Sequence, residues 1–533
     1  MTDRQRISTT YSYGIVSLAL VTLAACGGGG NSFNGAPPGG AGSDWTQGVF
    51  LDASTFAALC ASPRSGIDPF TGQPFLDIQG TATDENNFLR SHSNNTYLWY
   101  NEITDRDPGL FATLPYFDLL VTEATTASGQ LKDKFHFTIP SDEFFELSQS
   151  GITVGYGALW VFLSGGLPGE VVVGFTEPNS AATAAGLARG AQVLIADGVD
   201  LATVPTQADF DIAVAALFPS QAGLAIDFTV RDLDGTQRDI TMTTASVTST
   251  PVPKVNTIPT ATGNVGYVQF NDHIATAESG LIDAVNQLSA TGITDLVVDL
   301  RYNGGGFLDI ASEFAYMIAG PIPTAGMIFE TLVFNDKHPV TDPVTGQALI
   351  PTPFHTTTLG FDVAPGQALP TLGLSRVFVL TGPNTCSASE SIMNSLEGVN
   401  VEVIQIGSTT CGKPYGFYPA ENCGTTYFTI QFSGENNKGF GDYTDGFSPT
   451  NQTGVVGTIV PGCSVADDFS HALGDPLESR LAAALLYRDG QPCPAASGIA
   501  PPGAFKTSAG SDLAAVDGIA PKSVWHQNRI MRR

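Results

Sequence analysis

The chain has 533 residues, of which 42% are hydrophobic, and this excludes a disordered or fibrous protein. At about 100–200 residues per domain, the length allows about three to four domains. Acidic residues outnumber basic ones 51 to 23, which leaves a formal net charge of -28. Because neutralising phosphates requires clustered lysines and arginines, this balance excludes a nucleic-acid partner and argues against broad adhesion to anionic lipid surfaces.

The first 26 residues have the pattern of a targeting segment. Arg4 and Arg6 form a basic start, and the apolar run at 14–25 is too short to span a bilayer comfortably. The segment ends in Leu-Ala-Ala followed by Cys26, which resembles the lipobox of bacterial lipoproteins. The resemblance implies that Cys26 is lipidated and becomes the first residue of the mature protein. An ordinary signal peptide that ends in cysteine is the alternative.

Residues 27–48 are rich in glycine, proline and serine, and this composition predicts a tether between the anchor and the folded domains. Gly27 rather than aspartate follows Cys26, a feature that in many Gram-negative lipoproteins goes with sorting to the outer membrane. We therefore expect an envelope protein whose membrane partner is engaged through the Cys26 anchor. It is expected at the outer membrane, facing the periplasm or the exterior.

The seven cysteines leave six once Cys26 is set aside, and an even number in an exported chain indicates disulfides. We expect Cys411 to pair with Cys423, because they flank one predicted hairpin. No cysteine or histidine cluster has the spacing of a zinc site, so we predict neither a metal nor a cofactor. The other cysteines are Cys60, Cys386, Cys463 and Cys493.

Residues 49–150 predict a small helical N-terminal domain. Helix-like stretches occur at 85–92 and 116–123. The aromatic residues of this region are expected in its core rather than at a ligand site; they are Tyr97, Trp99, Tyr100, Phe135 and Phe137.

Residues 151–250 change in character to strands, with β-rich runs at 155–163 and 170–175. A run of small residues, then Ala-Gly-Leu, a glycine and a further strand follow, and this order resembles a bacterial PDZ domain over about 151–245. The resemblance implies that a peptide C-terminus adds as an extra strand, with its carboxylate on the backbone N–H groups of the loop containing Tyr156, Gly157 and Ala158. A plain β-sandwich turn is the alternative interpretation.

Residues 251–494 alternate between strand and helix patterns, which is typical of an α/β core. Residues 335–370 are rich in proline and glycine and predict an insertion or a lid, and residues 495–533 form a C-terminal tail. We expect strands at 266–270, 293–300, 375–381 and 401–406, and helices at 277–289, 307–319 and 388–396.

Two strand-to-helix turns contain candidate catalytic groups. The glycines at the end of 299–306 let the backbone turn freely and point N–H groups at a nearby oxyanion. The turn at 382–390 places Ser387 at a helix N-terminus, whose positive potential favours developing negative charge. Taken alone, the Ser-x-x-Glu spacing from Ser387 to Glu390 is better explained as a capping box.

A third segment, 409–416, places Lys413 beside a glycine after the next strand. A lysine in a dry pocket loses its proton more easily and could then take the proton of Ser387. Taken alone, Lys413 would more simply be a solvated loop lysine.

Together the motifs Asp-Leu-Arg-x-Asn-x-Gly-Gly, Ser-Ala-Ser-Glu and Gly-Lys, in this order after a PDZ-like segment, resemble those of peptidase family S41. This family comprises the carboxyl-terminal-processing, or tail-specific, serine peptidases, and the resemblance covers about residues 84–488. It implies a multidomain α/β (α+β) chain with a ClpP/crotonase-like core. It also implies Ser387 as nucleophile, Lys413 as general base, and an oxyanion hole formed by the backbone N–H groups of Ala388 and of Gly304 or Gly305.

The chain departs from the family pattern around the base. Phe417 stands where many members have a glutamine that orients the lysine, Pro414 replaces a glycine, and Cys386 precedes the nucleophile. These differences leave the support of Lys413 undefined and make Ser389 a second candidate nucleophile. His273 is a candidate base by analogy with a branch of the family that uses histidine.

The resulting prediction is a serine endopeptidase that cuts exported or envelope proteins after a PDZ domain has captured their C-terminal tails. The chain has no G-x-S-x-G elbow and no H-E-x-x-H motif. Asp467 and Asp468, near His471, are better explained as an acidic helix start. The alternatives are an inactive tail-binding scaffold and a lipoprotein that binds an apolar ligand on the same fold.

Overall fold

The computed structural model describes residues 45–452, 454, 456–495 and 529–531. The predicted signal peptide, the lipidation site Cys26 and nearly all of the tether and tail lie outside the described residues. Among the helices that are described, none is long and apolar enough to cross a membrane.

The N-terminal region combines helices with short strands. Helix α1 starts with a capping box, in which Thr81 and Asp84 each accept the other's backbone N–H. Helix α2 ends at Phe117, well short of the helical run expected to 123. Strand β3 pairs with β22, so the region shares a sheet with a later hairpin and is not purely helical. The elements are η1 (Ala53–Thr55), β1 (Leu59–Cys60), β2 (Ile78–Gln79), α1 (Ala82–Thr96), η2 (Tyr100–Glu102), η3 (Pro108–Leu110), α2 (Thr113–Phe117), β3 (Phe137–Pro140) and α3 (Ser141–Ser150).

The next region is β-rich, as expected. Its antiparallel sheet has the strand order β10-β9-β7-β6-β5, which leaves β5 at an edge, while β8 pairs with β7. Separately, β4 pairs with β11 at the two ends of the region. The elements are β4 (Ile152–Gly155), β5 (Ala158–Phe162), β6 (Val171–Thr176), α4 (Ala181–Ala184), β7 (Gln192–Ala196), β8 (Val199–Asp200), α5 (Gln207–Leu217), β9 (Ala225–Arg231), β10 (Gln237–Thr243) and β11 (Ala245–Thr248).

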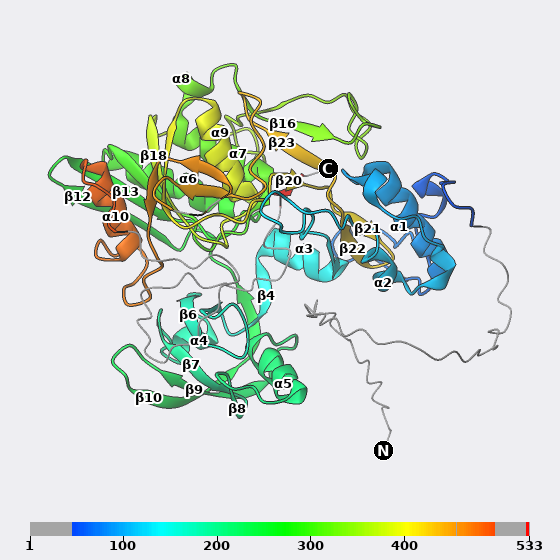
Figure 1. Ribbon diagram of the computed structural model, residues 1–533, viewed down its shortest axis with the longest axis horizontal. Helices are drawn as coiled ribbons and strands as arrows, with labels where there is room; N and C mark the ends of the chain where they lie inside the picture. The colour runs from blue at the N-terminus through cyan, green and yellow to red at the C-terminus, as the bar shows by residue number, and fades with distance from the viewer. Residues whose placement is uncertain (1–44, 453, 455, 496–528, 532–533) are drawn as a thin grey trace, which may run out of the picture. The chain divides into compact units, whose positions relative to one another are not determined.

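The core is a six-stranded sheet with the order β12-β13-β14-β18-β19-β26. Only β12 runs antiparallel to its neighbour; the other pairs are parallel. One face packs against α6, α7 and α9, which Figure 1 shows grouped beside the sheet, and the other packs against α10. Both faces are covered, so strands such as β14 are buried throughout. These elements are β12 (Lys254–Thr260), β13 (Gly263–Gln269), α6 (Ala277–Ala290), β14 (Asp295–Asp299), α7 (Leu308–Ala319), β18 (Arg376–Thr381), α9 (Ala388–Gly398), β19 (Glu402–Gly407), β26 (Gly462–Ser464) and α10 (Ser479–Arg488).

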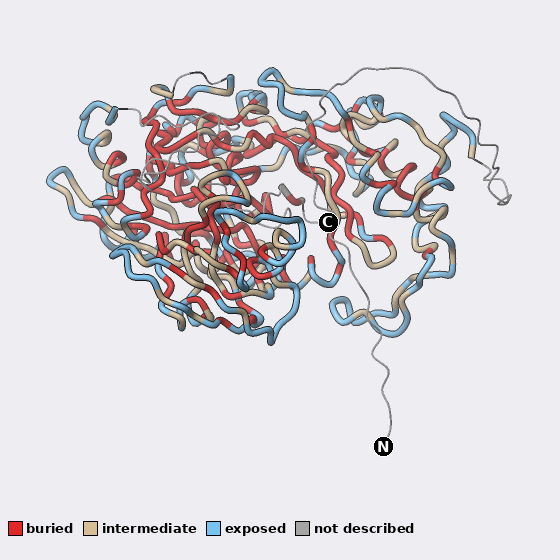
Figure 2. Tube along the Cα trace, turned by 60° about the horizontal axis from the view of Figure 1, so that its bottom comes forward, coloured by how far each residue is buried: buried red, intermediate tan, exposed pale blue. Residues whose placement is uncertain are grey.

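The expected core strands and helices are confirmed to within a few residues, the usual uncertainty of element ends. Figure 2 shows the buried stretches gathered in the interior of this core, with exposed stretches around its outside. Shorter strands extend from the core, including the sheet β17-β16-β23-β20. The remaining elements are β15 (Gly306–Phe307), α8 (Pro321–Thr324), β16 (Ile328–Phe334), β17 (Thr352–Pro353), β20 (Tyr415–Gly416), β21 (Ala420–Asn422), β22 (Thr425–Phe428), β23 (Phe432–Glu435), β24 (Phe447–Pro449), β25 (Thr458–Val460) and β27 (Arg529–Ile530).

The segment at 335–370 is held against the core by a buried carboxylate. Glu278, in the first turn of α6, accepts the backbone N–H groups of residues Leu359 to Val363. Burial beside this negative charge raises the pKa of Glu313 to about 9. The segment therefore has a charged anchor at Glu278; its role as a lid stays a prediction.

Three disulfides join Cys60 to Cys423, Cys386 to Cys411, and Cys463 to Cys493. The predicted Cys411–Cys423 pair is therefore wrong. The hairpin β21–β22 spans only 420–428, and Cys423 at its turn faces the N-terminal region. Cys411 lies outside this hairpin, against the Ser387 turn.

Candidate active site

Three turns meet at one edge of the core sheet. Strands β14, β18 and β19 are parallel neighbours, so the segments that follow them emerge side by side at their carboxyl ends. These segments are 300–306, 382–387 and 408–413. The structure thus brings together the three motifs that the sequence placed far apart.

Direct bonds join the first turn to the second. Asn303 O accepts the N–H of Cys386 at 3.1 Å and the hydroxyl of Ser389 at 3.0 Å. Thr385 Oγ1 donates to Leu300 O at 2.7 Å. Because the hydroxyl of Ser389 is already donated to a carbonyl inside the core, Ser389 is the weaker of the two candidate nucleophiles.

Ser387 occupies a strained position at the start of α9. Its φ of 61° and ψ of -114° lie in a region that non-glycine residues rarely adopt. The residue is fully buried, and its Oγ makes no cap hydrogen bond and has no hydrogen-bond partner in the part of the chain that the structure describes. Glu390 supplies the carboxylate half of a capping box, since it accepts the N–H of Ser387, while the serine hydroxyl remains available for chemistry.

Glu390 joins the serine turn to the lysine segment. Its carboxylate accepts the backbone N–H of Ser387 at 2.9 Å and that of Lys413 at 2.8 Å on the same oxygen. The other oxygen accepts the N–H of Gly412 at 2.9 Å and the hydroxyl of Thr410. Burial raises the pKa of Glu390, and these hydrogen bonds oppose that shift. The sequence showed Glu390 only as a capping residue, and nothing local indicated its bonds to the lysine segment.

Lys413 lies in a buried aromatic pocket. The side chain is buried, and Nζ lies 4.7 Å from the ring centroid of Phe135 and 4.7 Å from that of Phe417. Burial lowers the pKa of Lys413 to about 7, although the charges of Asp133 and Glu390 act against the shift. A lysine with this pKa is partly neutral at neutral pH and can accept a proton. Phe417, which departs from the family pattern, is thus part of the lysine's own pocket.

The predicted oxyanion donors differ in availability. The N–H of Gly305 donates to Asn303 Oδ1 at 2.9 Å and is engaged. Those of Gly304 and Ala388 donate no hydrogen bond within the described ranges. Ala388 opens α9, so its N–H also lies at the positive end of that helix. Gly304 and Ala388 are therefore the better pair, and Asn303 is a residue that the motif contained without indicating its role.

His273 packs beside the same turn. Asn303 Nδ2 donates to Phe270 O, and Asn303 Oδ1, which already accepts from Gly305, lies 3.0 Å from His273 Nδ1. The amide oxygen of Asn303 faces the ring and can only accept a hydrogen bond. The imidazole therefore carries its proton on Nδ1 and donates it to Asn303. His273 supports the glycine turn, while Ser387 Oγ makes no hydrogen bond to it.

The disulfide between Cys386 and Cys411 also joins the serine turn to the lysine segment. These two cysteines and Glu390 have the arrangement of a metal-ligand cluster, but the disulfide removes both thiolates as ligands.

Replacing both Cys386 and Cys411 with alanine should lower the free energy of unfolding by about 3 kcal/mol. This is the entropic contribution of a disulfide that closes a loop of this length in the unfolded chain. Peptidase activity should fall as well, because the two turns lose a covalent link. The matched control is alanine at Cys463 and Cys493, whose separation of 30 residues is close to the 25 residues of the first pair. Urea unfolding should give similar losses for both double variants. Equal losses of activity in the two would contradict a special role for the first bridge.

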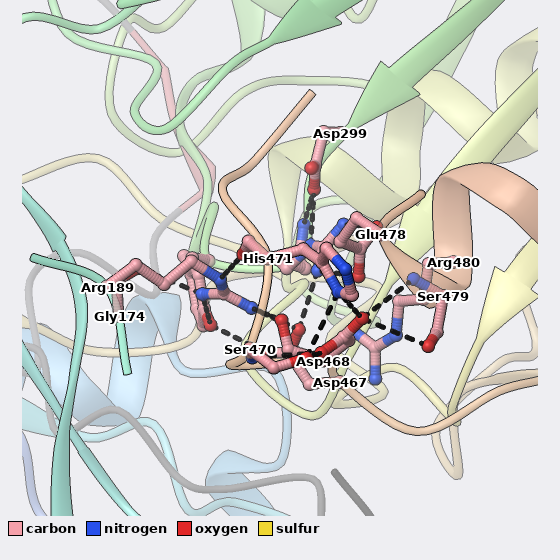
Figure 3. A network of polar contacts seen from close by, with 12 residues as sticks. Gly174, Arg189, Asp299, Asp467, Asp468, Ser470, His471, Glu478, Ser479 and Arg480 are labelled. Carbon is pink, nitrogen blue, oxygen red and sulfur yellow. Dashed lines mark hydrogen bonds and ion pairs between the residues drawn. The ribbon is translucent and has the colours of Figure 1, made fainter. Parts of the chain in front are cut away.

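A buried ionic network lies next to the start of the glycine turn, and Figure 3 shows its members around Asp467 and Glu478. Arg301, 1% exposed, donates to Asp299 at 2.9 Å, to Asp467 at 2.6 Å and to Glu478 at 2.8 Å. Burial opposes the ionisation of Asp467, but Arg189 and Arg301 outweigh it and hold the pKa of Asp467 far below its usual range. Asp467 is therefore an ion-pair acceptor and not a helix-starting residue.

Arg189 brings the β-rich region into this network. Its guanidinium donates to Asp467 at 2.6 Å and to the hydroxyl of Tyr302 at 2.7 Å. Tyr302 lies in the turn that leads to Gly304, so the β-rich region touches the candidate active site directly. No helix begins at Asp468 either, because α10 begins at Ser479 with Glu478 as its N-cap; Asp468 contacts it only from a distance in the chain, by accepting the N–H of Ser479.

The predicted peptide-binding loop opens the edge strand β5. Tyr156 is buried, and its hydroxyl donates to Ala216 O in α5 at 2.9 Å. Gly157 has a φ of 75°, and Ala158 is the first residue of β5. The Tyr156 ring is thus a core residue, whereas the backbone of the loop borders the edge strand.

Comparisons with known proteins match the chain to peptidase family S41 and to carboxyl-terminal-processing peptidases. A model of peptidase family S41 matches residues 264–417. The chain is 26% identical over 238 residues to a carboxyl-terminal-processing protease of Picosynechococcus sp., covering 44% of this chain and 49% of that protein. It is 25% identical over 291 residues to the chloroplastic carboxyl-terminal-processing peptidase 1 of Arabidopsis thaliana, covering 53% and 52%. The match thus spans about half the length of these curated relatives.

The fold has a counterpart among solved structures. A crystal structure from Bacteroides fragilis, assigned to the S41 proteases, superposes with a TM-score of 0.56 at 21% identity. The match covers 76% of this chain and 97% of that one. At this identity the likeness shows the fold alone, a mixed α/β chain with several sheets.

Proposed function

Because residues 264–417 are a peptidase family S41 domain, we propose that the protein is a serine endopeptidase with Ser387 as nucleophile and Lys413 as general base. One observation carries the assignment. The buried Lys413, with its pKa lowered to about 7, is bonded through Glu390 to the turn that holds the unbonded hydroxyl of Ser387.

The geometry supports acyl transfer. Neutral Lys413 takes the proton of Ser387 while Oγ attacks the peptide carbonyl carbon, and the N–H groups of Ala388 and Gly304 stabilise the oxyanion. The lysine ammonium then gives its proton to the leaving amine as the C–N bond breaks. A water molecule, deprotonated by Lys413, hydrolyses the ester and regenerates Ser387.

The β-rich region would supply the substrate. In the described part of the chain β5 has a strand partner only on the β6 side, so its other edge is open to an added peptide strand. Trp160, within β5, donates its indole N–H to Leu217 O, which packs the end of α5 against one face of this edge strand. We assign to the β-rich region the capture of C-terminal tails of protein substrates, in the manner of a PDZ domain.

An exported location fits this function. Three disulfides among the described residues favour an oxidising compartment. With lipidation at Cys26, the peptidase would be anchored at the outer membrane and would act on exported or envelope proteins.

The test is cleavage of an unstructured protein with an apolar C-terminal tail, together with labelling by a serine-directed phosphonate. Wild type should release fragments and acquire the label on Ser387, as located by peptide mass spectrometry. Ser387→Ala should do neither, whereas Ser389→Ala should stay within about tenfold of wild type because it removes only one hydrogen bond. A label on Ser389, or cleavage by Ser387→Ala, would contradict the assignment. A folded wild type that binds the tail and cuts nothing would indicate a scaffold.

A further inference from the structure

A distant segment of the chain forms a strand beside the candidate active site. Strand β27 pairs in parallel with β15, with Arg529 opposite Gly306 and Ile530 opposite Phe307. The N–H of Met531 donates to Phe417 O at 3.2 Å, and Ile530 forms a bridge with Phe417.

Both partners of this segment belong to the proposed catalytic machinery. Strand β15 begins at Gly306, directly after the glycines that supply the proposed oxyanion donor. Phe417 follows the lysine segment in the chain, and its ring lies 4.7 Å from Lys413 Nζ. The segment 529–531 therefore lies between the two turns that a substrate backbone would have to approach.

The side chain of Ile530 is buried among apolar groups. Ile530 is 4% exposed and belongs to the main apolar core together with Phe307 and Phe417. A small cavity lies beside it, and Ile530 lines this cavity together with residues that include Phe144, His273, Ile274, Gly305 and Phe307. Backbone pairing and one buried aliphatic side chain are how an added strand is recognised.

We propose that the edge of β15, together with the carbonyl of Phe417, is a peptide subsite of the active site, which the chain's own segment 529–531 fills as an intramolecular inhibitor. The proposal rests on the peptidase function proposed above. A substrate with an aliphatic side chain at the matching position must displace Ile530 before it can bind. Because the competitor belongs to the same chain, it acts at a high local concentration.

A binding experiment tests the occupancy without relying on catalysis. The probe is a fluorescently labelled peptide with the sequence of residues 525–533. It is titrated by anisotropy into two Ser387→Ala proteins, one complete and one ending at residue 528. We expect the shortened protein to bind the peptide at least about tenfold more tightly, because the complete chain fills its own subsite.

The peptide is basic and the protein has a formal charge of -28, so a charge-matched control is required. The control peptide carries Ile530→Ser, keeps every charge and should bind the shortened protein at least about tenfold more weakly. Equal binding of the two peptides, or equal binding to the two proteins, would overturn the proposal.

A second variant tests the proposal in the complete chain, so that misfolding of the shortened chain cannot explain the result. In the complete, active protein, Ile530→Asp should expel the segment and lower KM for the unstructured substrate several-fold. Ile322→Asp is the matched control, because Ile322 is 89% exposed and should leave KM unchanged. An unchanged KM in Ile530→Asp would argue against inhibition. If no variant cuts at all, the peptidase assignment fails, while the binding comparison still decides the occupancy.

Discussion

Replacing Lys413 with methionine should lower kcat/KM about 10⁴-fold, the largest loss expected from removing a general base that activates a serine. Methionine fits the pocket of Phe135 and Phe417 and removes only the titrating amine. The chain should therefore stay folded, as circular dichroism would confirm. The measurement is the rate of peptide cleavage at saturating and limiting substrate.

The pH profile separates a base from a structural lysine. With a pKa of about 7, Lys413 is protonated and inactive at low pH, so the wild-type rate should rise through pH 7 and level off above it. Lys413→Arg keeps its charge at every accessible pH and should stay inactive throughout. A wild-type rate independent of pH between 6 and 8, or a Lys413→Met variant within about tenfold of wild type, would refute the role.

The same shift predicts the pH dependence of stability. The unfolded chain holds the Lys413 proton up to its ordinary pKa, whereas the folded chain releases it near 7. Between these values the unfolded state binds more protons, so wild-type stability relative to Lys413→Met should rise with pH from about 7 to about 10.

Replacing Glu390 with alanine should lower the free energy of unfolding by about 4 kcal/mol, because buried donors of two turns lose their acceptor. These donors are the N–H groups of Ser387, Gly412 and Lys413. Activity should fall about 100-fold or more, since small displacements of reacting groups cost that much. Urea unfolding and the cleavage assay measure the two effects.

Two control variants test whether the lost carboxylate causes these effects. Glu390→Gln keeps the shape but turns an NH₂ group toward backbone N–H groups, so it should also lose stability, though less than alanine. Glu402→Ala, at an exposed position of β19, should change the free energy of unfolding by no more than about 0.5 kcal/mol. Wild-type stability of Glu390→Ala would mean that the carboxylate does not hold the two turns together.

The core elements could be predicted because hydrophobic periodicity is local information. Strands β14 and β18 and helices α6 and α7 were visible as apolar runs and helical stripes. The three motifs could also be expected to meet, because each follows a parallel strand.

Other features of the site depend on contacts between distant parts of the chain, which local sequence patterns cannot indicate. Phe135 reaches the Lys413 pocket from the N-terminal region, 278 positions away from the lysine it covers (413 minus 135). Segment 529–531 reaches β15 from the other end of the chain. The same limitation explains the wrong cysteine pair, since Cys423 bonds to a residue 363 positions away.

The bridge between Cys60 and Cys423 has a consequence for the order in which the chain matures. Cys60 is synthesised long before its partner, and Cys386 and Cys411 both appear in between. The short loops closed by the other two bridges cost less entropy, so those bridges can form early. The long one requires the N-terminal region to have docked onto the β21–β22 hairpin. A non-reducing gel that resolves this single crosslink would therefore follow completion of the whole fold, and would distinguish finished molecules from those whose core alone has formed.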